Sequence, residues 1–385
     1  MKSVDKPKNI MTKEILNDYR PYNDSEVPAA VHRIAQDVLF PQIARFIFPE
    51  KNSSNFLEEF KQIKTVDEFQ AKIMDKAISK VVEKTITNLS YTGVDALTND
   101  KSYMFISNHR DIVLDSAILQ TILLANKIKT TEITFGSNLM HPQFVVDVGK
   151  INKMFKIVHG GTIREIFENS LNVSEYMRYA ITEKRESTWI AQRNGRTKDG
   201  IDKTEIAVLK MFAMSSKKPF VENLEELNIT PIAVSYEYEP CDFLKTREIY
   251  FSRRQTYEKK EDEDFNSIQH GITQFKGNTH YTICETITHN ELSECAKLPR
   301  TEQFKELANI IDKKIYAGYK LWKTNYIAHD ILHKKSEFSD FYTANDREKF
   351  LEYMNNGLNL IDGDNSELQE IFLGIYANSV TTRNL

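Results

Sequence analysis

Between residues 103 and 237, short apolar runs alternate with longer segments of helical periodicity, and this alternation limits the possible folds more than any other feature. The apolar runs are rich in Ile, Val, Phe and Tyr. Strands that alternate with helices in this way form a mostly parallel α/β sheet flanked by helices. We predict strands at 103–107, 132–136, 155–159, 187–191 and 229–237, a further strand within 277–287, and helices at about 115–125, from Thr162 and from Lys203.

Helical periodicity extends on both sides of this region. Apolar residues recur at spacings of three and four from Val31 to Ile47, and Thr65 followed by Glu68 is typical of a helix start. Helical patterning returns after Thr301. We therefore predict a central α/β domain that is preceded by a helical bundle and followed by a helical C-terminal region, with boundaries at 1–92, 93–300 and 301–385.

Composition excludes several classes of protein. With 51 basic against 55 acidic residues, the net charge is −4, so no basic excess indicates nucleic-acid binding. The three cysteines show no zinc-ligand spacing and are typical of reduced thiols. The longest stretch without charged residues, 133–146, is shorter than the roughly 18 apolar residues of a membrane helix. We expect a cytoplasmic protein whose membrane contact is at most peripheral, with 38–48 as a candidate amphipathic stretch that could equally be bundle core.

The first candidate for chemistry is the segment that follows strand 103–107. His109 comes directly after the strand, and the carboxylates Asp111 and Asp115 follow within a few residues. A carboxylate can hold one imidazole nitrogen and leave the other to take a proton from an alcohol. Asp115 stands at the start of the next predicted helix, and Asp111 is the competing partner. In the alternative interpretation, Asn108 and Asp115 are simply turn and helix-capping residues.

Two further strand ends carry groups that are suited to phosphate. Arginine can bind phosphate oxygens bidentately, glycine lets the backbone come close, and a helix start favours an anion. The alternative for each is a solvated basic turn. The candidates after strand 187–191 are Arg193, Gly195, Arg196 and Lys198, and those after strand 155–159 are His159 and Arg164, beside Gly160-Gly161 and Thr162.

Together these strand ends resemble the glycerolipid acyltransferases, the family of glycerol-3-phosphate and 1-acylglycerol-3-phosphate acyltransferases. Asn108-His109 and Asp115 occupy the places of the family's first block, in which NH, four residues and D open a helix. The helical region before the domain is similar to that of the soluble plastid members. The segments that resemble the second, third and fourth blocks are 155–165, 189–200 and 229–237.

The sequence departs from the family pattern at three places. One extra residue separates His109 from Asp115, so the loop must bulge there. In the second block the family's usual arginine falls near Val158 or His159, which leaves His159 or Arg164 as substitutes. In the third block the carboxylate of the family's usual EGxR is replaced: Asn194, Gly195 and Arg196 occupy the region, with Arg193 before it.

The resemblance implies a reaction and its participants. An acyl-CoA or acyl carrier protein thioester would donate the acyl group to glycerol-3-phosphate, 1-acylglycerol-3-phosphate or another phosphate-bearing alcohol or lysophospholipid. His109 would act as the base and Asp115 would orient it, with no metal or tightly bound cofactor. Two alternatives stay open: a relative that binds lipid or acyl carrier without transfer, and a helical scaffold protein.

Overall fold

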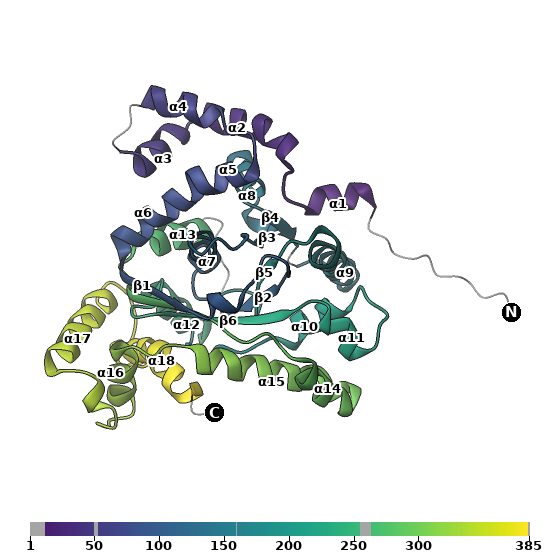
Figure 1. Ribbon diagram of the computed structural model, residues 1–385. Helices are drawn as coiled ribbons and strands as arrows, with labels where there is room; N and C mark the ends of the chain where they lie inside the picture. The colour runs from purple at the N-terminus through teal and green to yellow at the C-terminus, as the bar shows by residue number, and fades with distance from the viewer. Residues whose placement is uncertain (1–11, 50–52, 159, 255–262, 384–385) are drawn as a thin grey trace.

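The computed structural model describes residues 12–49, 53–158, 160–254 and 263–383. Within them the chain forms a seven-stranded sheet in the order β1-β7-β6-β2-β5-β3-β4 (Figure 1). Strands β6, β2, β5, β3 and β4 run in one direction, and β7 pairs antiparallel with β6. The strands are β1 (Ile86–Thr92), β2 (Met104–Ser107), β3 (Glu132–Gly136), β4 (Met154–Ile157), β5 (Thr188–Ala191), β6 (Ile229–Tyr236) and β7 (Gly277–Ile283).

The predicted fold class is confirmed. Each predicted apolar run contains a strand, and the sheet is mostly parallel with helices around it and at both ends of the chain. The prediction of a helical segment through residue 92 is wrong for its last part, since β1 is a strand that pairs with β7. Its partner is nearly two hundred positions away, and local periodicity cannot reveal a pairing between such distant segments.

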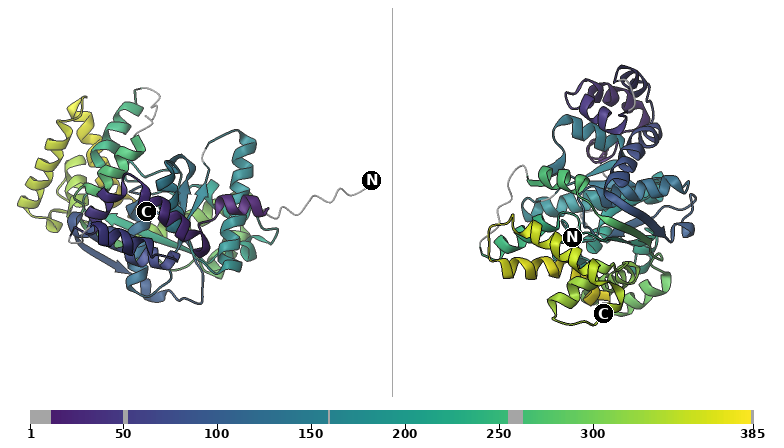
Figure 2. Two further views of the ribbon diagram at one scale, coloured as in Figure 1. Left: turned by 90° about the horizontal axis from the view of Figure 1, so that it is seen from above. Right: turned by 90° about the vertical axis from the view of Figure 1, so that its left-hand side faces the viewer.

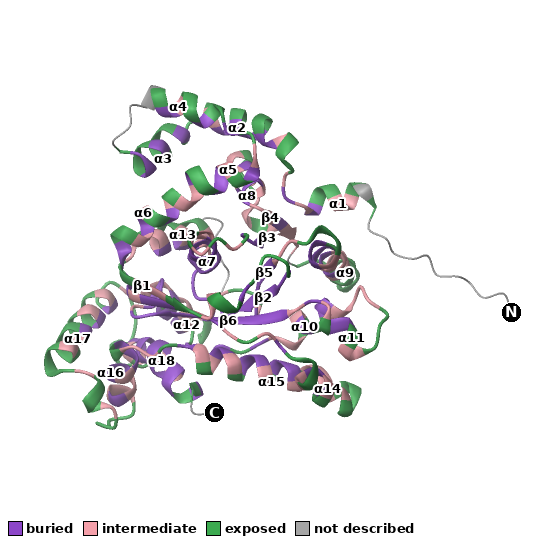
Figure 3. Cartoon of the chain, viewed as in Figure 1, coloured by how far each residue is buried: buried purple, intermediate pink, exposed green. Residues whose placement is uncertain are grey.

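The two faces of the sheet belong to two separate parts of the core, as the alternation of side chains in a strand requires. Met104 and Ile106 of β2 pack into the part that contains residues of α9 (Ile163–Tyr179), α10 (Ile206–Ala213) and α15 (Arg300–Gly318). Phe105, on the opposite face, packs with α6 (Asp75–Thr85) and α7 (Leu114–Ala125). Strands β2 and β6 and the inward sides of these helices are buried, whereas most of β1, at the edge of the sheet, is exposed or half-buried (Figure 3).

The N-terminal helices form a smaller apolar cluster beside the sheet. They pack with α8 through aromatic and aliphatic side chains, and Arg33 donates to both oxygens of the buried Asp147 on α8, at 2.8 and 2.7 Å. Thr65 accepts from the Glu68 N–H, which confirms the predicted helix start. The elements of this cluster are α2 (Val27–Gln36), α3 (Phe40–Ile47), α4 (Ser53–Lys61), α5 (Val66–Phe69) and α8 (Gln143–Ile151), whereas α1 (Lys13–Tyr19) packs against α9 and β4.

The C-terminal helices lie at the opposite end of the molecule from the N-terminal ones (Figure 2). Their shared apolar cluster includes α12, α16, α17 and α18. No helix among the described residues is long and apolar enough to cross a membrane. The remaining helices are α11 (Phe220–Glu225), α12 (Asp242–Ser252), α13 (Glu263–Thr273), α14 (His289–Lys297), α16 (Lys323–Leu332), α17 (Ala344–Leu358) and α18 (Asn365–Arg383), with π-helical turns at Gln70–Met74 and Ala180–Lys184 and 3-10 turns at Asp24–Glu26, Val94–Ala96, Ser137–Leu139 and Ser339–Phe341.

Candidate active site

His109 and Asp115 form a hydrogen-bonded pair at the carboxyl end of β2. His109 Nδ1 lies 3.0 Å from Asp115 Oδ2, and Asp115 is the second residue of α7. The Asp115 side chain is fully buried, whereas 13% of the His109 side chain is exposed. A carboxylate accepts hydrogen bonds, so Nδ1 carries the proton and Nε2 is left as a proton acceptor. In parallel sheets ligands bind at this edge.

Of the two carboxylates predicted near His109, Asp115 is the one that contacts the imidazole. Asp111 Oδ1 accepts from the N–H groups of Val113 and Leu114, at 2.9 and 2.8 Å, and so caps the start of α7. Asp115 Oδ2 accepts from the N–H groups of Arg110 and Asp111, at 2.6 and 2.9 Å, in addition to His109. The extra residue of the loop is thus accommodated by a turn that folds around the Asp115 carboxylate.

Asn108 anchors the same loop to the neighbouring strand. Its side chain accepts from the Val234 N–H at 2.7 Å and donates to the Val234 carbonyl and to Asp202, both at 2.9 Å. It is fully buried. Asn108 is therefore more than a turn residue, because its side chain connects the end of β2 to β6 and to the loop after β5.

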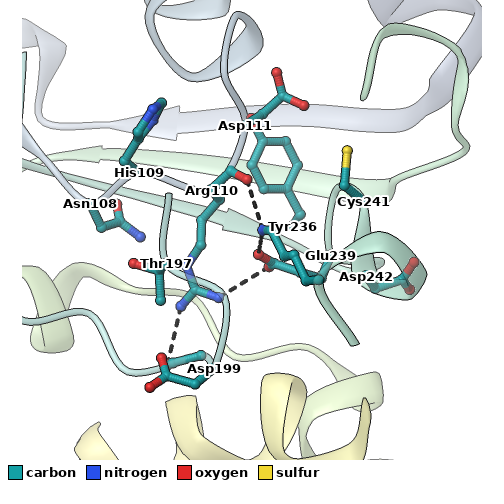
Figure 4. Close-up of polar contacts among 12 residues, drawn as sticks. Asn108, His109, Arg110, Asp111, Thr197, Asp199, Tyr236, Glu239, Cys241 and Asp242 are labelled. Carbon is teal, nitrogen blue, oxygen red and sulfur yellow. Dashed lines mark hydrogen bonds and ion pairs between the residues drawn. The ribbon is translucent and has the colours of Figure 1, made fainter. Parts of the chain in front are cut away.

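A buried charge network, which sequence reasoning missed, lies on the other side of the loop from His109. Figure 4 shows the His109 and Arg110 side chains leaving the loop in different directions. Arg110 donates to Asp202 at 2.6 Å and to Glu239 at 3.1 Å, and Lys245 donates to Glu239 at 2.6 Å and to the Arg110 carbonyl at 2.8 Å. Burial opposes the charge of Arg110, but Asp202 and Glu239 together raise its pKa well above the ordinary value. Two cations and two carboxylates thus balance each other.

The basic loop after β5 lies directly beside His109. The Thr197 N–H donates to the His109 carbonyl at 2.7 Å, so the two loops are joined through their backbones. Arg193 Nε and Arg196 Nη1 are buried and have no hydrogen-bond partner among the described residues. Lys198, in contrast, forms an ion pair with Glu248 of α12. Of the predicted cations in this loop, the two arginines are therefore the ones with a buried nitrogen that has no partner among the described residues.

The glycines of this loop differ in their surroundings. Gly195 has a φ of +73°, and a β-carbon there would meet nothing within 4 Å. Gly200 has a φ of +80°, and a β-carbon there would lie 2.2 Å from the carbonyl oxygen of Ile375 on α18. The backbone needs glycine at Gly200 for its conformation and for the close approach of α18.

The structure does not bring Arg164 to this site. It lies on the first turn of α9, its side chain is 87% exposed, and it pairs with Glu168 at 2.8 Å. The physical reason is the strand order, because β5 and β3 separate β4, which precedes α9, from β2. The predicted capping role of Thr162 is confirmed, since it accepts from the Glu165 N–H. His159 lies outside the described residues.

A second group of titratable side chains, which the sequence pattern does not reveal, surrounds Asp111. Its Oδ2 is buried without a hydrogen-bond partner among the described residues. A β-carbon on Gly271 of α13 would lie 2.2 Å from this oxygen, so α13 packs directly on Asp111. Lys276 is buried nearby, and burial lowers its pKa to about 8 against the opposing attraction of Asp111. These residues lie on three separate elements, which explains why no sequence motif joins them.

A cavity of about 890 Å³ opens next to the basic loop. Arg193 contributes to its wall, together with the segment 203–207 and the exposed side of α15. At its base Asp312 accepts from the Thr204 hydroxyl at 2.6 Å, and burial raises the Asp312 pKa to about 6. Among the described residues, no group of three or more His, Cys, Asp or Glu side chains is placed to hold a metal ion.

The comparisons with known proteins include a distant structural similarity. No family model matches the sequence, and no curated protein matches it. Among solved structures the chain is similar to the 1-acyl-sn-glycerophosphate (LPA) acyltransferase PlsC from Thermotoga maritima, with a TM-score of 0.38 and 11% identity over 75% of this chain and 93% of that chain. The class that fold and site define is an α/β protein with a histidine–aspartate pair at a strand end.

Proposed function

We propose that this protein is an acyltransferase that moves a fatty acyl group from a thioester to the hydroxyl of a phosphate-bearing alcohol. The observation that carries the proposal is the 3.0 Å contact between His109 Nδ1 and Asp115 Oδ2, with the other imidazole nitrogen left as base. The pair stands at the strand edge where a parallel sheet binds its ligands, beside a loop with two arginines that have unused donors.

The chemistry needs only proton transfer and carbonyl attack. His109 Nε2 removes the proton of the acceptor hydroxyl as its oxygen attacks the thioester carbonyl carbon. The tetrahedral intermediate then collapses, the C–S bond breaks, and the proton on the imidazolium passes to the departing sulfur. The products are an ester and a free thiol. Asp115 holds the imidazole tautomer and stabilises the imidazolium, as the carboxylate of a hydrolase triad does.

The acceptor's phosphate is assigned to the basic loop after β5. Arg196 precedes Thr197, whose N–H is bonded to the His109 carbonyl, and the phosphate is assigned to the buried Arg196 nitrogen that has no partner among the described residues. Arginine is suited to this task because its fork matches two phosphate oxygens. Glycerol-3-phosphate and 1-acylglycerol-3-phosphate have this combination of phosphate and hydroxyl. Arg193, Gly195 and Lys198 complete the proposed loop.

The donor is proposed to be acyl-CoA or acyl carrier protein, used without metal or other cofactor. We further propose a cytoplasmic protein that touches the membrane from one side, where lipid acceptors are found. The support is the region of α3: Phe40 and Ile47 are buried in the N-terminal cluster, while Val38 and Phe46 are 85% and 40% exposed. The stretch 38–48 thus has one side packed in the core of the N-terminal helical cluster and another apolar side exposed, which could contact a membrane surface.

The decisive experiment measures acyl transfer by the purified protein and by His109→Ala. Radiolabelled acyl-CoA and acyl carrier protein thioesters are each offered with glycerol-3-phosphate, 1-acylglycerol-3-phosphate or unphosphorylated glycerol. We expect acceptor-dependent thioester consumption, a preference for phosphorylated acceptors, and a loss of about 10²- to 10⁴-fold in His109→Ala, the range for a general base.

The chain offers a matched control for this variant. His289 Nδ1 lies 3.0 Å from Glu225 Oε1, the same kind of contact, but on the exposed surface. His289→Ala should therefore keep wild-type transfer. Near wild-type turnover in His109→Ala would overturn the proposal. Thioester binding without acceptor-dependent consumption would identify a binding protein instead.

A further inference from the structure

The end of strand β6 reaches past the strand beside it. Ser107, the last residue of β2, is paired with Ile232, and Tyr236 stands four residues further along β6. At about 3.3 Å per residue, Tyr236 lies about 13 Å beyond that pair, over the loop that carries His109. Ile232, Val234 and Tyr236 share the face that packs on α7. The alternation of the strand therefore points the Tyr236 side chain at the start of that helix.

The Tyr236 hydroxyl makes a specific contact there. It donates to Asp115 Oδ1 at 2.8 Å, while Oδ2 of the same carboxylate accepts from His109 and two backbone N–H groups. Tyr236 is only 1% exposed and Asp115 is fully buried. The two oxygens thus have separate partners. Tyr236 fixes the carboxylate plane, because a rotation that turned Oδ2 away from His109 would also break the bond to Oδ1.

We infer that Tyr236 is a positioning residue, which acts through Asp115 to set the orientation and the proton affinity of His109. The inference rests on the proposed function for its catalytic meaning. A hydroxyl that donates to Asp115 draws negative charge from the carboxylate, so the imidazolium of His109 is stabilised less than it would be by an unbonded carboxylate.

A neighbouring tyrosine supports the backbone of the same helix start. Tyr281 of β7 is paired with Val234, and its hydroxyl lies 3.1 Å from the Leu114 carbonyl and 3.2 Å from the Asp115 carbonyl. Burial, followed by the charge of Asp115, raises the pKa of Tyr236 well above its ordinary value, so its hydroxyl keeps its proton and remains a donor. Tyr236 holds the carboxylate and Tyr281 holds the main chain.

The competing explanation is that Tyr236 only fills space in the core. The chain contains a matched pair for this comparison, since Tyr176 is also fully buried and donates to the buried Glu132 at 2.6 Å. Tyr176 belongs to α9 and packs on the other face of the sheet. Tyr176→Phe removes the same kind of bond at a place where it cannot reach His109. Both variants should lose stability, but only Tyr236→Phe should change the titration of the His109 imidazole.

The experiment follows the imidazole of His109 by NMR across pH in the wild-type protein, Tyr236→Phe and Tyr176→Phe, and assigns the signal with His109→Gln. In Tyr236→Phe we expect the His109 titration to move to higher pH, by up to about one pH unit, because loss of the donor leaves a more basic carboxylate. The acid limb of kcat/KM should move in the same direction, with kcat reduced by about ten-fold, the scale of one hydrogen bond to a charged group. Tyr176→Phe should match wild type in both.

A second substitution gives the opposite sign and does not depend on Tyr236→Phe folding. Placing 3-fluorotyrosine at position 236 makes the hydroxyl a stronger donor, so the His109 titration should move to lower pH. An unchanged titration with either substitution in folded protein would overturn the inference. The NMR readout needs no turnover. A shifted titration in a protein without transfer activity would support the role of Tyr236 and refute the proposed function. His109-dependent transfer with an unshifted titration would support the proposed function and refute the role of Tyr236.

Discussion

The N–H of Thr197 and the carbonyl of His109 are joined by a 2.7 Å hydrogen bond, which makes the loop after β2 and the loop after β5 one structural unit. The base and the proposed phosphate-binding arginine therefore have a fixed spacing along the backbone. An enzyme that must align a hydroxyl and a phosphate of one small molecule gains from such a connection, because correct alignment accounts for a large part of a rate enhancement.

The two carboxylates near His109 should respond differently to amide substitution. Asp115→Asn places an amide where His109 and two N–H groups need an acceptor, so we expect a loss of turnover approaching about 10⁴-fold, as for the carboxylate of a triad. Asp111→Asn keeps the side-chain oxygen that caps α7 and should retain turnover within about ten-fold. Turnover is to be compared at equal folded fraction, judged by circular dichroism. A large loss confined to Asp111→Asn would contradict the assignment.

The basic loop should show one important cation and one dispensable cation. Arg196→Ala removes a guanidinium with an unused buried donor and should raise KM for the phosphorylated acceptor by about 10- to 100-fold, the equivalent of one or two charge-assisted hydrogen bonds. Lys198→Ala removes a cation already paired with Glu248 and should change KM by about three-fold or less. Initial rates over a range of acceptor concentrations separate KM from kcat. Equal effects of the two substitutions would count against a phosphate on Arg196.

The two glycines of the loop make a pair for stability measurements. Gly195→Ala introduces only backbone strain, which should lower the free energy of unfolding by about 1–2 kcal/mol at a positive φ. Gly200→Ala adds a clash with the Ile375 carbonyl, so the total cost should reach about 3 kcal/mol or more. Urea unfolding followed by fluorescence gives both values. If the two variants were equally stable, α18 would not approach Gly200 as closely as described.

Stability should depend on pH through Asp242. This carboxyl accepts from the hydroxyls of Tyr376 and Tyr353, and burial raises its pKa to about 6. The folded state then binds more protons than the unfolded state between about pH 4 and 6, so the contribution of Asp242 to stability falls as pH rises through this window, by about 3 kcal/mol in all. Urea unfolding at a series of pH values should show this decline in the wild-type protein and a flatter profile in Asp242→Asn. Identical stability profiles of the wild-type protein and Asp242→Asn would show that another group is responsible for the pH dependence.

The sequence is informative where one residue pattern determines the outcome locally. The runs at 132–136 and 187–191 have the length and composition of strands, and both are strands. His109 and Asp115 could be paired in advance because a strand end and a helix start fix their positions. In contrast, β1 depends on a partner far along the chain, so the local pattern predicts that the helical bundle continues there.

The rest of the site depends on tertiary packing. Asp202, Glu239 and Lys245 look like ordinary surface charges in the sequence, and only the fold buries them around Arg110. Tyr236 lies within the predicted strand 229–237, but the register that carries it past Ser107 is a property of the assembled sheet. Arg164 is the opposite case: the sequence pattern predicts a role at the site, but the strand order puts β4, the strand before it, three positions from the strand that precedes His109.

The contact of α18 with the loops of the site has a consequence for folding. Arg110 donates to Ser379 at 3.3 Å across 269 positions of sequence, and Ile375 covers Gly200. Contacts between such distant segments form late, because a long loop of chain must close first. During refolding from urea, helical circular dichroism should therefore recover before the loop of His109 is in place. The docking of α18 is then the step that turns a folded sheet into a competent site.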